Sequence, residues 1–294
     1  MYRLLIVMIL GCFLSISSYS QELNLFLQDI KEERLHGQTQ RSTSDSISKI
    51  TFTTAVNGIK LDEYHLIKLG RIQVIDDTGK SLEEIKDVFY NNEVYHKDKR
   101  MEFTVKAPVR QATKIKMVEG ILLYFTPTQA NKGKVIIRDF LQRKDENLLA
   151  DSYPEIELKL MDNEKLINMQ EEMQKMVDKE VEKRKKEGTI SEEEQQEIDY
   201  AREFIEDIMG MVNGSSKRAT LTFQLNQPLD QAFYRISIFN ENDTKISSGY
   251  YSIDTIYQFY LSEAPTKNCY IEILMENENA VKELPFQFLD VVLP

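Results

Sequence analysis

The chain has 294 residues, with 48 Asp and Glu against 37 Lys and Arg, so its net charge at pH 7 is −11. This acidic balance argues against nucleic acid and anionic lipid as partners, because both are bound through clustered basic side chains. The length is ample for two domains.

The first twenty residues have the pattern of a secretory signal. Arg3 precedes an apolar run at residues 4–10, and the small residues Ser18 and Ser20 suit a signal-peptidase site. We expect residues 1–20 to be a signal peptide cleaved near Ser20, and the protein to be exported to the periplasm, the cell surface or the medium. Without Arg3 the basic residues number 36 against 48 acidic ones, a net charge of −12.

Cys12 allows a second interpretation, in which residues 9–12 are a lipoprotein box and Cys12 is acylated. The apolar core before Cys12 is short and hydrophobic residues continue after it, so this interpretation is less favoured. No later apolar run approaches the roughly 18 residues of a transmembrane helix. Cys269 would be the one cysteine left after cleavage, so no internal disulfide is expected.

Residues 21–46 are polar apart from a short amphipathic piece at 23–27, and they predict a leader that is at best partly ordered. From Ile47 onward the apolar residues alternate with polar ones, as in half-buried strands. Strands are expected at Ile50 and Phe52; at Ile72, Val74 and Ile75; at Met101, Phe103 and Val105; at Ile115 and Met117; and at residues 121–125, with Gly120 as a hinge between the last two.

The same order of strand patterns recurs after residue 216. Residues 221–223 resemble 50–52, 236–243 resemble 72–77, 258–265 resemble 102–108, and 270–274 resemble 114–118. A repeated order argues for a duplicated domain, and short strands in units of about 100 residues favour a Greek-key sandwich. We expect two tandem immunoglobulin-like β-sandwiches, 47–145 and 146–294. A single large sandwich or barrel is the alternative.

Between the repeats, at residues 162–213, the apolar spacing changes to three and four, which indicates paired helices. The expected seam residues are Leu166, Met169, Met173 and Met176 in the first arm, and Ile198, Ala201, Ile205, Ile208 and Val212 in the second. Gly188 suits the end of the first helix, and Ser191 with Glu194 forms a capping box for the next. Because strand patterns flank it, we expect an antiparallel α-helical hairpin inserted into the second sandwich.

No residue pattern specifies catalysis, a cofactor or a metal. None of His36, His65 and His96 has another His or Cys at zinc-ligand spacing, so each is read as a turn or surface residue. The oxygen-rich turns at 76–79 and 240–243 lack the ligand spacing of a calcium loop. Nucleophile-elbow and phosphate-loop motifs are absent, and Cys269 has no evident histidine partner. The sequence therefore predicts a protein that is not an enzyme.

One stripe of the hairpin is a candidate binding surface. Tyr200, Phe204 and Met211 flank the seam of the second arm, and they widen its apolar arc beyond what one partner helix needs. The surplus must cover either the protein's own sandwich or another molecule. The first is favoured, since a projecting hairpin commonly folds back. If the stripe is exposed, these three residues are the predicted partner-binding residues.

Two segments carry a family resemblance. Residues 112–122, ATKIKMVEGIL, look like the strand pair A-x-K-I-x-x-V-x-G-x-L, and residues 285–294, PFQFLDVVLP, are similar to the closing pattern P-F-x-F-x-D-V-x-L-P. Both patterns resemble those of an uncharacterised family of exported bacterial proteins with repeated immunoglobulin-like domains. The resemblance spans residues 47–294, and its core and edge-strand patterns imply a fold and no activity. The helical hairpin departs from the family pattern.

Together these features predict a non-enzymatic, exported interaction or scaffold module of the cell envelope that binds a protein or a glycan. The alternative is a hydrolase or carbohydrate-active accessory protein, whose carboxylates converge only in the folded chain. A purely structural spacer is the third possibility.

Overall fold

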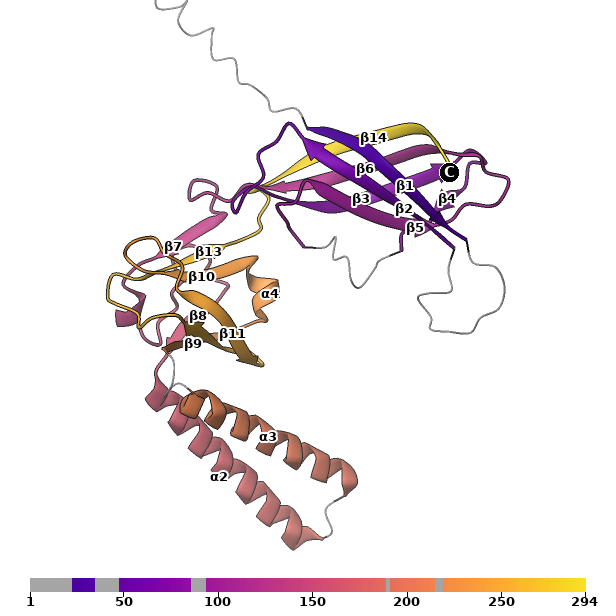
Figure 1. The fold of residues 1–294 in the computed structure, drawn as a ribbon. Coiled ribbons are helices and arrows are strands. Elements are labelled where there is room, and N and C mark those ends of the chain that lie inside the picture. Colours follow the sequence, from indigo (N-terminus) through magenta and orange to yellow (C-terminus); the bar gives the residue numbers. More distant parts are fainter. Residues whose placement is uncertain (1–22, 35–47, 86–93, 189–190, 215–218) are drawn as a thin grey trace, which may run out of the picture. The chain divides into compact units, whose positions relative to one another are not determined.

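The computed structural model describes residues 23–34, 48–85, 94–188, 191–214 and 219–294 (Figure 1). The expected signal peptide, Cys12 and His36 lie outside these residues. The chain divides into two compact units. Unit 1 consists of the described residues up to Thr126 together with Val281–Pro294, and unit 2 is Pro127–Ala280. Within the described ranges the fold is mainly β, and none of the helices has the length and apolar character needed to cross a membrane.

Unit 1 is built from two antiparallel sheets. The three-stranded sheet has the order β1-β2-β5 and the four-stranded sheet the order β14-β6-β3-β4. The strands are β1 (Asn24–Glu33), β2 (Lys49–Asn57), β3 (Leu66–Asp76), β4 (Ser81–Leu82), β5 (Arg100–Lys106), β6 (Lys114–Phe125) and β14 (Val281–Val292).

One hydrophobic cluster joins the two sheets of unit 1. Phe52 on β2 and Phe103 on β5 stack with ring centroids 4.9 Å apart, and they pack with buried residues of β3, β6 and β14 such as Val118 and Phe286. The alternation read from the sequence places these side chains on the inner faces, because successive residues of a strand point to opposite sides. Unit 1 is therefore sandwich-like, with its core between the sheets.

Unit 2 repeats this arrangement with a three-stranded sheet, β10-β13-β7, and a four-stranded sheet, β11-β12-β9-β8. Phe223 and Phe259 meet edge to face at 5.7 Å in its core. Its elements are β7 (Lys134–Ile137), the 3-10 helix η1 (Phe140–Gln142), β8 (Leu158–Met161), α2 (Asn163–Glu187), α3 (Glu192–Gly214), β9 (Thr220–Leu225), α4 (Leu229–Ala232), β10 (Arg235–Phe239), β11 (Ser247–Ile253), β12 (Ile256–Leu261) and β13 (Tyr270–Leu274).

The long helices α2 and α3 lie between β8 and β9 in the chain, in the interval where the sequence predicts a helical hairpin. They run side by side in opposite directions (Figure 1). β8 and β9 are antiparallel neighbours, with Met161 opposite Thr222. The chain therefore leaves β8 into α2 and enters β9 after α3 at the same end of the sheet.

Strands with similar sequence occupy equivalent places in the two units. β2 and β5 are neighbours in unit 1, as β9 and β12 are in unit 2, and β3 and β6 correspond in the same way to β10 and β13. The turns after β3 and β10 also match. Asp76 Oδ1 accepts from the backbone N–H of Thr78 (3.0 Å) and Lys80 (2.9 Å), and Asn240 Oδ1 accepts from those of Asn242 and Thr244 (both 3.0 Å).

The division between the units differs from the expected boundary at residues 145 and 146. The units divide between Thr126 and Pro127, and the closing segment assigned by sequence to the second sandwich belongs to unit 1. The reason is strand pairing. β14 pairs with β6, from Val281 opposite Phe125 to Val292 opposite Lys114, whereas β7 pairs with β13 of unit 2.

Two smaller expectations were also wrong. Residues 24–33, expected to belong to a partly ordered leader, form β1 and pair with β2 in antiparallel register. A register shift between Leu27 and Asp29 breaks the alternation that would have revealed this strand. The two strands expected on either side of Gly120 are one continuous strand, β6, because Gly120 keeps its place opposite Phe286 and Ile72 in the sheet.

Candidate partner-binding surface of the helical pair

Local signals explain where the two helices begin and end. The Asp162 carboxylate accepts a hydrogen bond from the Glu164 N–H (3.1 Å), which caps the first turn of α2. At the other end Gly188 has φ 149° and donates its N–H to the Arg184 carbonyl. Glycine is needed there because side chains rarely adopt this backbone conformation. The Gln195 N–H donates to the Ser191 carbonyl (2.9 Å), as expected when Ser191 precedes the first residue of α3, Glu192.

Among the described side chains, an apolar seam and a polar link between the helices hold α2 and α3 together. Val181 of α2 and Ile198 and Ile205 of α3 are buried. The Arg184 guanidinium donates to Glu180 on its own helix (2.8 Å) and reaches Glu197 on α3 (3.5 Å). The seam therefore combines dispersion and hydrophobic contact with a link between charged groups.

The expected seam of α2 is wrong at Met176, whose side chain is 63% exposed. The neighbouring Val177 is half-buried and Val181 is buried, so the contact row follows Met173, Val177 and Val181 at steps of four. Steps of four bring side chains onto one helical stripe, as steps of three do, and the sequence pattern alone allowed either. The side chains of Leu166 and Met169 lie outside what the structure describes.

Two ion pairs tie the start of α2 to the loop before β8. Lys144 Nζ lies 2.6 Å from the Asp162 carboxylate, and Lys165 Nζ lies 2.7 Å from Asp145. The Asp162 carboxylate raises the pKa of Lys144 by hydrogen bonding and by charge attraction. Both pairs are exposed, so they contribute little to stability. Their effect is to orient the first turn of the helix relative to unit 2.

Of the three predicted partner-binding residues, the structure places one side chain. Tyr200 is 73% exposed on α3. Phe204 and Met211 are helical residues of α3, but their side chains are not among those described. For Tyr200 the fold-back interpretation, in which the stripe covers the protein's own sandwich, is therefore wrong. Although α3 contacts β11, Tyr200 remains open to solvent.

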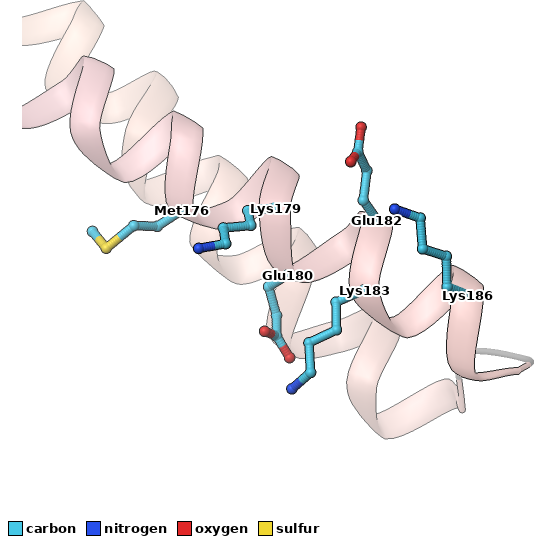
Figure 2. A pocket seen from close by; sticks show the side chains of 6 residues that line it. All are labelled: Met176, Lys179, Glu180, Glu182, Lys183 and Lys186. Carbon is cyan, nitrogen blue, oxygen red and sulfur yellow. The ribbon is translucent and has the colours of Figure 1, made fainter.

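An open hollow of about 690 Å³ runs along α2. Figure 2 shows its lining side chains on successive turns of the helix, with Glu180 and Lys183 pointing to the same side and Glu182 to the other. The lining residues are Met176, Lys179, Glu180, Glu182, Lys183 and Lys186. Glu180 already bonds Arg184. The lining of the hollow therefore combines an apolar methionine with three ammonium groups and two carboxylates.

This row of lysines was not among the residues predicted from the sequence. Lys179, Lys183 and Lys186 are spaced by four and three, so they lie along one helical stripe. Their spacing was a usable signal, but the acidic charge of the whole chain concealed it. Among the described residues, no three His, Cys, Asp or Glu side chains lie close enough together to bind a metal ion.

The two described histidines occupy structural positions. His65 Nδ1 lies 2.7 Å from Asp62 Oδ1 in a tight turn, where Asp62 also accepts from the Tyr64 N–H. Hydrogen bonds from Lys60 and His65 hold the pKa of Asp62 well below its usual range. His96 pairs with Ile67 through two backbone hydrogen bonds, and burial lowers the pKa of its imidazole.

His96 gives unit 1 a pH dependence. Because its folded pKa lies below the unfolded value near 6.5, the unfolded state binds the proton more tightly. The contribution of neutral His96 to the stability of unit 1 is present above pH 6.5 and is lost as the pH falls through the folded pKa. Denaturant titrations at pH 7.5 and pH 5 should show a lower unfolding midpoint at pH 5, and a smaller difference in His96→Gln. An equal difference in both proteins would contradict this assignment.

Comparisons of the chain with protein families, curated proteins and solved structures found no match.

Proposed function

We propose that this protein is a non-enzymatic, exported interaction module of the cell envelope. Its two β units are scaffolds, and the helical hairpin of α2 and α3 binds a protein partner. The observation that carries the proposal is the exposure of Tyr200 and Met176 on a paired helical element. Exposed aromatic and methionine side chains are enriched where proteins bind one another.

We also propose that both units are immunoglobulin-like sandwiches related by duplication. The order of strands supports this for unit 2. If β8 to β13 are lettered A to F, the four-stranded sheet holds A, B, E and D, and β7 takes the place of G beside C and F. This is the arrangement of constant-type immunoglobulin domains. The matched turns at Asp76 and Asn240 support the duplication.

The chemistry of the hairpin indicates what kind of partner it binds. Lys179 and Lys183 are exposed beside Met176, so an acidic segment with an apolar side chain would be complementary to this stripe. A glycoside hydrolase typically uses two carboxyl groups that face each other about 5–10 Å apart. Glu180 and Glu182 of the hollow point to opposite sides of α2, and therefore lend that alternative no support (Figure 2).

Replacing Tyr200 by alanine tests the proposal. We expect at least about a tenfold loss of affinity for the partner recovered from envelope extracts, since a central aromatic hot spot typically contributes about 2 kcal/mol. Stability should change by less than about 0.5 kcal/mol, because the side chain is largely exposed. Phe26→Ala removes another exposed aromatic, on β1 of unit 1, and is the matched control.

Affinity is measured by titrating the recovered partner onto immobilised full-length protein. A second variant, Lys179→Glu with Lys183→Glu, should weaken binding and reduce its salt dependence if the partner is acidic. Equal affinities of the native protein and Tyr200→Ala would show that the hairpin does not bind this partner through Tyr200, and would refute the proposal. Recovery of a glycan in place of a protein would refute the partner class.

A further inference from the structure

The order of strands along the chain does not follow the order of the units. β7 comes directly after β6, and β14 directly after β13. In two tandem sandwiches each of these strands would close the unit that precedes it. Here β7 pairs with β13 of unit 2, and β14 pairs with β6 of unit 1. Tandem order would place β7 in unit 1 and β14 in unit 2. The structure has the reverse arrangement.

The lengths of the strands explain why the exchanged arrangement is the stable one. β6 has 12 residues and β14 has 12, and they pair from end to end. β13 has 5 residues and β7 has 4. If β7 lay on β6, most of β6 would have no neighbour on that side, and the backbone N–H and C=O groups there would form a long open sheet edge.

Side chains fit the exchanged pairs as well. Leu284, Phe286 and Val291 of β14 are buried in the core of unit 1. A Cβ atom at Gly120 of β6 would lie only 2.3 Å from the Phe286 ring, so the glycine makes room for this phenylalanine. On the other unit, Lys134 of β7 lies 2.7 Å from the carboxylate of Glu272 on β13. Each strand thus carries side chains matched to its observed partner.

We infer that the two units have exchanged their closing strands, and that the β6 edge is a strand-accepting surface which β14 of a second copy can also occupy. The occupant is the same in both cases, because the β6 edge is complementary to the sequence of β14. Only residues 275–280 join β14 to β13, and residues 126–133 join β6 to β7. Exchange of an identical element between copies is a low-cost route to a dimer.

Concentration decides between the two forms. A strand tethered to its own chain has an effective concentration in the millimolar range, so the monomer should dominate at micromolar concentrations. Refolding at about 1 mM should allow β14 of one copy to pair with β6 of another. This exchange rests on the observed pairing of β14 with β6 and does not depend on the proposed function of the hairpin.

Cysteine pairs in the full chain test the inference, with Cys12 and Cys269 replaced by serine. Glu119 and Gln287 are exposed and directly opposite each other on β6 and β14. Opposed residues of antiparallel strands have Cα atoms about 4.5–5.5 Å apart, within the range of a disulfide. The double variant Glu119→Cys with Gln287→Cys should therefore oxidise to an intramolecular disulfide in the monomer.

Mixing the two single variants tests the second copy. Glu119→Cys and Gln287→Cys chains, unfolded together and refolded at about 1 mM, should give a disulfide-linked heterodimer several-fold more abundant than at about 10 µM. The control replaces Gln287→Cys with Glu283→Cys, an exposed position opposite Leu123 and four residues away. The control should give only the yield of random collisions.

Two results would overturn the inference. If the double variant forms no intramolecular disulfide, β14 does not lie on β6 in this register. If it forms one but the mixed chains give no more heterodimer than the Glu283→Cys control, the β6 edge accepts only its own strand.

Discussion

Replacing Gly120 by alanine should destabilise unit 1 by about 1–3 kcal/mol, the usual cost of forcing an extra methyl group into a packed site. The new Cβ would lie 2.3 Å from the Phe286 ring and 2.9 Å from the Arg71 carbonyl oxygen. The ring can move only by losing its place in the core, and the carbonyl belongs to the neighbouring strand. The change in the free energy of unfolding is measured by urea titration.

Phe286→Ala should itself cost about 3 kcal/mol, because it leaves a cavity in a buried cluster. In the double variant the methyl group introduced by Gly120→Ala points toward that cavity. The double variant should therefore lose less free energy of unfolding than the sum of the two single losses, by more than about 0.5 kcal/mol. Gly249→Ala is the control, since nothing lies within 4 Å of a Cβ at that position. Strict additivity would mean that residues 120 and 286 do not touch.

Removal of the Lys134 side chain should lower the free energy of unfolding of unit 2 by about 2 kcal/mol. The Glu272 side chain is only 3% exposed and lies 2.7 Å from Lys134 and 3.4 Å from Arg235. Lys134→Ala leaves a buried carboxylate with one of these two cations. Breaking a fully buried pair costs more, and the partial exposure of Lys134 lowers the expected value.

The free energy of unfolding of unit 2 is measured by urea titration, with a spectroscopic probe placed near β7 to report on this unit. Lys134→Arg keeps the positive charge and should recover most of the lost stability. Lys144→Ala is the matched control, because Lys144 also pairs with a carboxylate, that of Asp162, but in an exposed position. A loss in Lys134→Ala no larger than in Lys144→Ala would show that Glu272 does not depend on its lysine.

The local structure was largely predictable from the sequence. Alternation located β2, β5 and the second half of β3, because one face of each strand is buried in the core. The change of period located α2 and α3. Asp76 and Asn240 were read as turn residues, and both form side-chain to backbone hydrogen bonds typical of turns.

Pairing between distant strands was not predictable in the same way. The alternation of Leu284, Phe286 and Phe288 shows that β14 has an inner face, but it does not say which sheet receives it. The sequence therefore placed this strand in the wrong unit. The match in length that favours β6 over β13, 12 residues against 5, is visible only in the folded chain.

The candidate site was predictable in part. The surplus apolar stripe singled out Tyr200, and the structure shows this residue exposed, whereas its binding role stays a prediction. Met176 was assigned to the seam, although it lines the hollow on the other side of the row formed by Val177 and Val181. A three-four spacing fixes the helical stripe only to within one residue, and the packing of α3 decides which side chain faces inward.

Hydrogen exchange measured by mass spectrometry on Phe286→Ala tests the central claim most directly, namely that the end of the chain closes unit 1. If β14 lies on β6, exchange should accelerate at β2, β3 and β6, while β9, β12 and β13 keep the protection they have in the native protein. Loss of protection at β13 with full protection at β6 would contradict this pairing, because β14 would then close the unit that precedes it.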